Sequence, residues 1–169
     1  MQIGVKLFHN KISGLLFHFK KLGYNTFMNN LNISFPLSRN EVVSMLQHFK
    51  ISPTRQRVEI AEFLFQCAQH LSAEKILEGV TDAGNRVSRA TVYNTMGLFA
   101  NKGVVREVLI DRERVFYDSN PDVHQHLYNV DSGKLTDVYN AELDLLSAPE
   151  LPEGLKIVDM DIVFKVSAK

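Results

Sequence analysis

The chain has 169 residues, 45% of them apolar, so it can bury a core in one domain or in two small ones. No apolar stretch reaches the roughly 18 residues that a membrane-spanning helix needs, and we expect a soluble, cytoplasmic protein with no membrane partner. The single cysteine, Cys67, excludes an internal disulfide and any zinc site built from several cysteines.

The formal net charge of zero hides a gradient along the chain. Basic residues exceed acidic ones by four in residues 1–49 and by two in residues 50–114, whereas acids are in excess by six in residues 115–169. Such an asymmetry is typical of a DNA-contacting N-terminal half joined to a metal-binding or dimerising C-terminal half.

Residues 1–37 are basic and mix Phe and Leu with Asn, Lys and Gly. They lack the uninterrupted apolar segment and the small-residue cleavage site of a secretory signal. We interpret them as an N-terminal extension that is poorly ordered or lies upstream of the native start. An arm that touches DNA is the alternative.

Four short helices are predicted next, over residues 38–51, 55–70, 73–84 and 89–103. The last three follow residues that commonly cap a helix N-terminus: Thr54, Ser72 and Ser88. The glycines at positions 84 and 103 are expected to end the third and fourth helices. The helical period of the second helix places its inner face at Val58, Ala61, Phe65 and Ala68, with Cys67 as a small core residue.

After the fourth helix the apolar period changes to that of strands. Residues 104–110 and 114–118 flank the charged turn "DRE" and predict a β-hairpin. Short helices followed by a hairpin are the order of a winged helix-turn-helix, which we place at residues 38–119. In that architecture the last helix enters the major groove and the hairpin lies along the DNA backbone.

Residues 122–169 predict a small second domain. Strands at 124–130 and 134–139 are joined by a turn at Asp131-Ser132-Gly133, a short helical or irregular piece follows, and a last strand covers 155–166. In that last strand the apolar residues that alternate with polar ones are Val158, Met160, Ile162, Phe164 and Val166. A sheet this small needs a partner for its face and edges, and homodimerisation supplies one. The expected fold is α+β, a winged helix-turn-helix followed by a small α/β dimerisation domain.

The fourth helix carries the side chains best suited to DNA. Val92, Met96 and Phe99 are expected to pack inward, which leaves polar side chains on the outer face. The candidate DNA-binding residues are Arg55, Arg57, Arg86, Ser88, Arg89, Thr91, Tyr93 and Asn94, types that bond phosphates and base edges. From composition alone, an amphipathic helix with a mixed polar face explains the same pattern.

Four segments in this order and spacing resemble the ferric uptake regulator (Fur) family of bacterial metal-responsive repressors. They are "PTRQRVEIAEFL", "HLSAEKILEGV", "VSRATVYNTMGLFANKGVV" and "HQHLYNVDSGKLTDV". The resemblance covers roughly residues 40–166. It implies a winged-helix domain, a C-terminal dimerisation domain and a homodimer on a palindromic DNA operator.

Carried over residue by residue, the resemblance implies a metal site of His70, Asp118, His124, His126 and Asp137. His124 and His126 are two residues apart on a strand and so share one face, although such a pair alone also fits two ordinary strand histidines. Nitrogen and carboxylate ligands suit Fe(II), Mn(II) or Zn(II). Because the ligands come from both predicted domains, one ion would hold the domains at a fixed angle and shift the spacing of the two recognition helices.

The chain also departs from the family pattern. Asn129 and Ser132 stand where many members have the first cysteine pair of a structural zinc site, so we expect no such site. Val123 and Gln125 replace the ligands of a further family metal site, and Asn94 replaces an arginine that often follows the helix tyrosine.

The missing cysteines and the C-terminal segment most resemble the iron response regulator branch. That resemblance implies control of iron and haem genes, with His124 and His126 as haem ligands and a haem-delivering or haem-synthesis protein as a partner. Two alternatives remain open: a peroxide-sensing repressor that uses Fe(II) at the same five ligands, and a small non-haem iron enzyme, which would need a substrate pocket.

Overall fold

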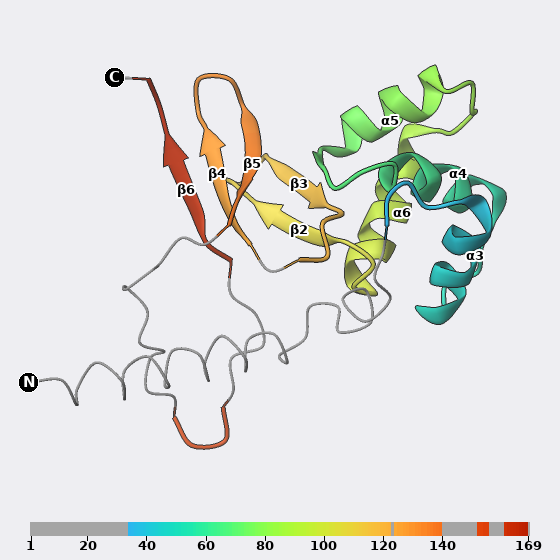
Figure 1. Cartoon of the computed structure of the whole chain (residues 1–169), viewed down its shortest axis with the longest axis horizontal. Coiled ribbons are helices and arrows are strands. Elements are labelled where there is room, and N and C mark those ends of the chain that lie inside the picture. The colour runs from blue at the N-terminus through green and yellow to red at the C-terminus, as the bar shows by residue number, and fades with distance from the viewer. Residues whose placement is uncertain (1–33, 123, 140–151, 156–160, 169) are drawn as a thin grey trace, which may run out of the picture. The chain divides into compact units, whose positions relative to one another are not determined.

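The computed structural model describes residues 34–122, 124–139, 152–155 and 161–168 (Figure 1). The chain divides between Asp122 and Val123 into two compact units. We call the unit containing residues 34–122 the N-terminal unit, and the unit containing the described residues from 124 onward the C-terminal unit. Within these ranges, no helix is long and apolar enough to cross a membrane. Residues 1–33 of the expected N-terminal extension lie outside the described residues.

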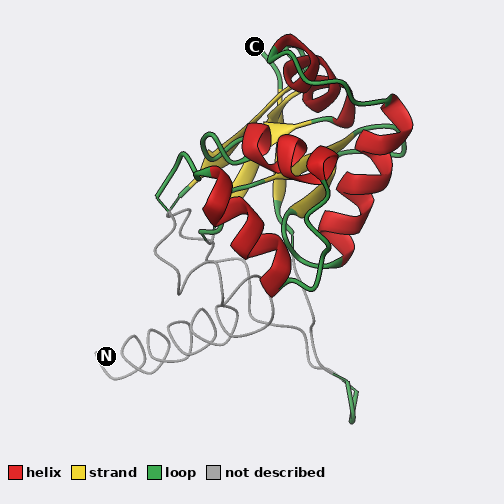
Figure 2. Ribbon diagram, turned by 90° about the vertical axis from the view of Figure 1, so that its right-hand side faces the viewer, coloured by secondary structure: helices red, strands yellow, loops and turns green. Residues whose placement is uncertain are grey.

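The N-terminal unit contains the four predicted helices, and helices are drawn in red in Figure 2. They are α3 (Arg39–His48), α4 (Arg55–Leu64), α5 (Ala73–Asp82) and α6 (Arg89–Asn101). Ser38 forms a reciprocal capping box with Glu41, and the side chains of Ser72 and Ser88 accept hydrogen bonds from the first turns of α5 and α6. Gly103 has φ +74° just beyond α6, which allows the chain to leave that helix.

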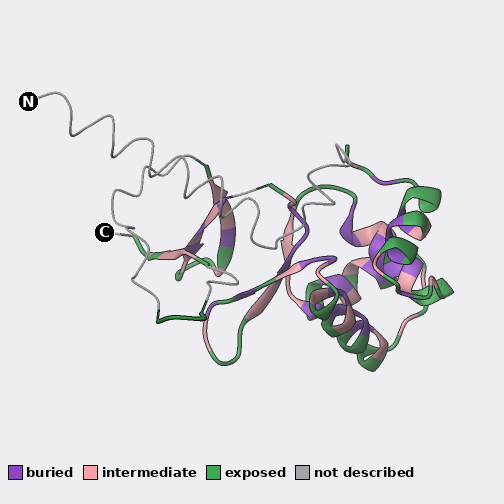
Figure 3. Ribbon diagram, turned by 90° about the horizontal axis from the view of Figure 1, so that it is seen from below, coloured by how far each residue is buried: buried purple, intermediate pink, exposed green. Residues whose placement is uncertain are grey.

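One face of each helix packs into a shared core. Figure 3 shows the buried residues in purple. As predicted, Val92, Met96 and Phe99 of α6 are fully buried, and Ile76 and Val80 of α5 lie beside them in the same core. Helix α5 approaches α4 so closely that a side chain at Gly79 would collide with the ring of Phe63. Close packing of this kind explains a glycine in a helix interior, where it otherwise costs about 1 kcal/mol relative to alanine.

The second predicted helix was too long. It ends at Leu64 instead of His70, and its C-terminal carbonyls at Phe63 and Leu64 accept hydrogen bonds from the Gln69 side-chain amide. The chain has therefore left the helix before Cys67 and Ala68, and both are exposed instead of buried as expected.

The residues that follow form a short strand that we did not predict. Strand β1 (His70–Leu71) pairs antiparallel with β3 (Val115–Asp118), and β3 pairs with β2 (Arg106–Leu109) to complete the predicted hairpin. The resulting sheet has the order β1-β3-β2. The added strand fixes the backbone of His70 opposite Asp118.

The C-terminal unit contains a second three-stranded sheet among its described residues. Strands β4 (Gln125–Asn129) and β5 (Lys134–Val138) form the predicted antiparallel pair, and β6 (Val163–Val166) lies parallel to β4. Gly133 has φ +68° in the connecting turn, as its position there requires. Predictions for residues 140–151 and 156–160, including burial of Val158 and Met160, lie outside the described residues.

Candidate metal centre and DNA-facing helix

In the N-terminal unit, two of the predicted metal ligands lie side by side. The β1–β3 register places His70 opposite Asp118, and His70 Nε2 lies 3.4 Å from Asp118 Oδ1. Both side chains are almost fully buried. Asp118 Oδ1 also accepts a hydrogen bond of 2.7 Å from the backbone N–H of Asn120, which fixes the orientation of the carboxylate.

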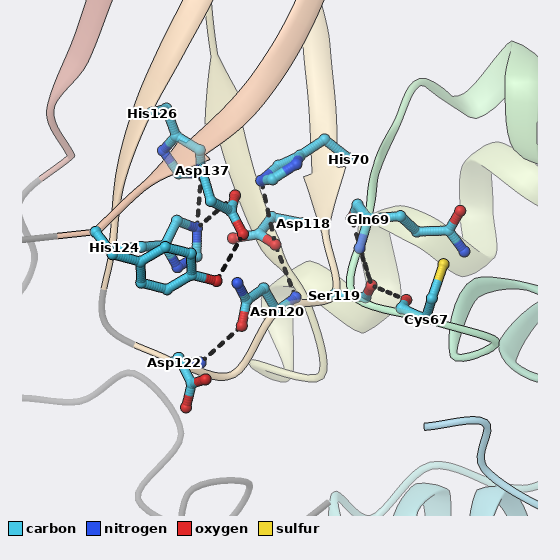
Figure 4. A network of polar contacts seen from close by, with 11 residues as sticks. Cys67, Gln69, His70, Asp118, Ser119, Asn120, Asp122, His124, His126 and Asp137 are labelled. Atoms are coloured by element: carbon cyan, nitrogen blue, oxygen red, sulfur yellow. Dashed lines mark hydrogen bonds and ion pairs between the residues drawn. The ribbon is translucent and has the colours of Figure 1, made fainter. Parts of the chain in front are cut away.

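A hydrogen-bond network holds this pair in place (Figure 4). The Ser119 hydroxyl lies 3.1 Å from the carbonyl of Cys67, to which it donates, and accepts from the backbone N–H of Gln69 at 3.1 Å. The backbone N–H of Ser119 donates to the carbonyl of Gln69. The residues next to both ligands are thereby tied together, so the His70–Asp118 spacing depends on β1 being joined to β3.

In the C-terminal unit, the other three predicted ligands converge (Figure 4). His126 on β4 is in register with Asp137 on β5, and His124 precedes β4. The two Nε2 atoms of His124 and His126 are 3.0 Å apart, and His124 Nε2 lies 3.3 Å from Asp137 Oδ1. Both histidines are buried.

The spacing of these three ligand atoms suits a transition-metal ion. Two nitrogens that each lie about 2.1 Å from one ion are roughly 3.0 to 3.4 Å apart when the angle at the ion is between 90° and tetrahedral. The distances from His124 Nε2 to His126 Nε2 and to Asp137 Oδ1 fall within this range. Imidazole with carboxylate is a donor set that Fe(II), Mn(II) and Zn(II) accept.

Tyr139 is part of this cluster, although we did not select it from the sequence. Its hydroxyl donates to Asp137 Oδ2 at 3.0 Å, and its ring centroid lies 5.9 Å from that of His124. The carboxylate of Asp137 therefore directs one oxygen to the histidine and the other to the phenol. The position two residues beyond Asp137 was the available signal, because alternate strand residues share a face.

Asn129 has a structural role at the position where the family resemblance pointed to a missing cysteine. Its side-chain oxygen accepts hydrogen bonds from the backbone N–H groups of Asp131 and Ser132 at 3.0 and 2.9 Å. Asparagine commonly shapes turns in this way. The β4–β5 turn is thus stabilised by a side-chain amide.

The predicted DNA-binding residues all belong to the N-terminal unit, on α4, on α6 and just before α6. Arg89, Tyr93 and Asn94 are exposed on α6, opposite its buried face, while Thr91 is half-buried and its N–H donates to the Ser88 hydroxyl. The flanking arginines also have partners in the protein: Arg55 with Glu59 at 2.7 Å, and Arg57 with the carbonyl of Ser52 at 3.0 Å. The hydrogen bond to Glu59 raises the pKa of Arg55 further above its ordinary value.

Glu74 was not selected from the sequence, yet it contacts this helix. Tyr93 donates a hydrogen bond from its hydroxyl to Glu74, and Arg89 Nη1 lies 3.7 Å from the same carboxylate. Glu74 lies in the first turn of α5, and no short-range spacing relates it to positions 89 and 93.

Comparisons with known proteins agree with this architecture. The model of the ferric uptake regulator family matches residues 38–165. The ferric uptake regulation protein of Pseudomonas aeruginosa is 31% identical over 129 residues, which are 75% of this chain and 96% of that protein. The peroxide-responsive repressor PerR of Staphylococcus epidermidis is 27% identical over 104 residues, 62% of this chain and 69% of that protein.

A solved structure supports the same assignment. The ferric uptake regulator from Pseudomonas aeruginosa with manganese has a TM-score of 0.62 and 26% identity, and the match covers 79% of this chain and 99% of that one. The fold is therefore the expected winged helix-turn-helix with a dimerisation domain. The matched proteins are transcriptional regulators and not enzymes. The chain belongs to the ferric uptake regulator family of metal-responsive, DNA-binding transcriptional regulators.

Proposed function

We propose that this chain is an iron-responsive regulator whose affinity for a DNA operator changes when one divalent ion binds at His70, Asp118, His124, His126 and Asp137. The observation that carries the proposal is the convergence of His124, His126 and Asp137 at metal-ligand spacing in the C-terminal unit. The His70–Asp118 pair in the N-terminal unit supplies the same kinds of ligand, an imidazole nitrogen and a carboxylate oxygen. When bound, the ion supplies a fixed positive charge that N and O ligands from both units can share.

The residues then couple metal to DNA. Each unit holds its own ligands through strand pairing, so an ion that requires both sets favours one relative orientation of the units. In a homodimer this orientation sets the distance between the two copies of α6. A coupling free energy of about 2 kcal/mol changes operator affinity roughly thirtyfold.

Helix α6 is the proposed recognition helix. Its exposed residues Arg89, Tyr93 and Asn94 are suited to base edges, while Arg55, Arg57 and Arg86 are suited to phosphates. Homodimerisation through the C-terminal unit, which would present two recognition helices to a palindromic operator, belongs to the same proposal.

Haem and peroxide are the competing effectors. His124 and His126 would be the haem ligands, as the resemblance to the iron response regulator branch implies. Peroxide sensing is favoured by the match to a peroxide-responsive repressor. A titration of the metal-free protein with Fe(II), Mn(II), Zn(II) and haem, read by absorbance and by DNA binding, separates these cases. A Soret band that is lost in the His124/His126 double variant identifies haem; gain of an oxygen atom by a histidine in Fe(II)-loaded protein after peroxide identifies peroxide sensing.

The central test uses His126→Ala, with His48→Ala on the exposed end of α3 as the matched control. The DNA probe is selected from a random duplex pool by the metal-loaded wild-type protein. We expect added Mn(II) or Fe(II) to change the affinity of wild type and His48→Ala at least tenfold, because both retain the ligand set. His126→Ala should lose the metal response while remaining folded, and fluorescence anisotropy measures the affinity. A response of wild-type size in His126→Ala contradicts the proposed site.

A further inference from the structure

Glu74 is an acidic residue placed against the DNA-facing side of α6. It lies in the first turn of α5, and its side chain is 47% exposed. Its carboxylate contacts two residues of α6, Tyr93 by a hydrogen bond and Arg89 as an ion pair of 3.7 Å. The guanidinium of Arg89 also lies 5.8 Å from the centre of the Tyr93 ring. Three side chains from two helices thus form one small cluster, which we call the Glu74 cluster.

The protonation states in the Glu74 cluster are well defined at neutral pH. The hydrogen bond from Tyr93, together with the nearby Arg89, lowers the pKa of Glu74 below its ordinary value. The same hydrogen bond raises the pKa of Tyr93. The carboxylate is therefore an ionised acceptor and the phenol a neutral donor.

A carboxylate at this place acts against DNA in two ways. It repels phosphates, and it occupies donors of Tyr93 and Arg89 that base edges would otherwise use. Non-operator DNA offers mainly phosphate contacts. These contacts compensate neither for the repulsion by Glu74 nor for breaking its contacts with Tyr93 and Arg89. An operator offers base-edge acceptors, to which Tyr93 and Arg89 can donate hydrogen bonds in place of those to Glu74.

We propose that Glu74 is a specificity-determining residue, which holds Tyr93 and Arg89 on the protein and releases them only to a duplex with matching base edges. This inference rests on the proposed role of α6 as the recognition helix. It makes discrimination depend on an acidic side chain that itself makes no favourable contact with DNA, as expected where specificity includes a repulsive element.

The test compares Glu74→Gln with Glu78→Gln. Glu78 lies one turn further along α5, has a side chain that is 60% exposed, and pairs with Lys75 instead of with α6. Both substitutions remove one negative charge from the same helix, so they share any general effect of net charge. Affinity is measured for metal-loaded protein with the selected operator duplex and with a scrambled duplex of equal composition, over a series of salt concentrations. Thermal unfolding confirms that both variants are folded.

We expect Glu74→Gln to lower the ratio of operator to scrambled affinity about fivefold, mainly by tighter binding of the scrambled duplex. Glu78→Gln should leave the ratio within about twofold of wild type. Tyr93→Phe should remove part of the effect of Glu74→Gln, because the phenol no longer has a hydrogen bond to transfer. Equal ratios in the two glutamine variants overturn the inference. If wild type does not distinguish the two duplexes, the proposed function has failed instead.

Discussion

At the scale of single residues, the candidate metal cluster of His124, His126 and Asp137 depends on how one carboxylate is oriented. Asp137 directs Oδ1 toward His124 at 3.3 Å and Oδ2 toward the Tyr139 hydroxyl at 3.0 Å. A hydrogen bond to the second oxygen keeps the carboxylate from rotating. Loss of an outer partner of this kind commonly weakens metal binding about 10- to 100-fold.

We therefore expect Tyr139→Phe to weaken metal binding about tenfold without removing the site. The ring and its packing remain, and only the hydroxyl is lost. Competition with a chelating dye for Mn(II) or Zn(II) measures the affinity. The control is Tyr93→Phe, which loses the hydrogen bond of another tyrosine hydroxyl to a carboxylate, that of Glu74 on α5. An affinity equal to that of wild type would show that Tyr139 does not orient the carboxylate.

The resemblance to the ferric uptake regulator family indicated the candidate ligands, whereas the residues that support them were not predicted. The H-x-H pair alone also fitted two ordinary strand histidines, and the spacing of the four matching segments singled it out. Glu74, Ser119 and Tyr139 are ordinary residue types, and their roles arise from hydrogen bonds across elements. Such bonds leave no local pattern.

At the scale of elements, helix starts differ in how well they are capped. The Ser38 hydroxyl accepts a hydrogen bond from the backbone N–H of Glu41, and the backbone N–H of Ser38 donates one to the Glu41 carboxylate. Thr54, in contrast, occupies the N-cap of α4 without a side-chain cap hydrogen bond. Both residues are exposed, so loss of packing contributes little in either case. Comparing the stability effects of substituting Ser38 and Thr54 therefore isolates the contribution of the capping hydrogen bonds.

Ser38→Ala is expected to lower the free energy of unfolding by about 1 kcal/mol, since it removes the hydrogen bonds of the Ser38 hydroxyl with the backbone N–H and the carboxylate of Glu41. Thr54→Ala should change it by less than about 0.5 kcal/mol. Urea unfolding followed by circular dichroism gives both values. Equal losses in the two variants would mean that the Ser38 hydrogen bonds add nothing beyond side-chain propensity.

Elements with a strong local signal were predicted well, and a two-residue strand was not. The apolar period and cap residues located α5 and α6 almost to the residue. The second helix was extended through positions that in fact form a turn and β1, because Phe65 and Ala68 continue the helical period. Pairing with β3 decides the conformation of His70 and Leu71, and this pairing joins residues about fifty positions apart.

At the scale of the whole molecule, the proposed ion would join two sets of ligands that are separate along the chain. The His70–Asp118 pair is built by sheet β1-β3-β2, and the remaining three ligands are built by sheet β5-β4-β6. An ion held by both sets stabilises both sheets. An ion held by the C-terminal ligands alone stabilises one.

Hydrogen exchange distinguishes these two cases. At a free Mn(II) concentration of about one hundred times Kd, binding stabilises the folded sheets that hold the ion by roughly 2.7 kcal/mol. We expect slower exchange in β3 as well as in β4 and β5, and His70→Ala should remove the protection of β3. Protection confined to β4 and β5 would contradict a shared ion.

The sequence by itself determined the order of elements and the inner faces of the helices, and its resemblance to the ferric uptake regulator family indicated the candidate metal ligands. The elements follow from local rules: apolar period, capping residues and turn glycines. The tertiary structure decided that α4 ends at Leu64, that Cys67 is exposed, that β1 sets His70 opposite Asp118, and that Glu74 and Tyr139 contact functional side chains. Each of these depends on pairing or hydrogen bonding between distant segments, whose free energy is gained only once the chain has folded.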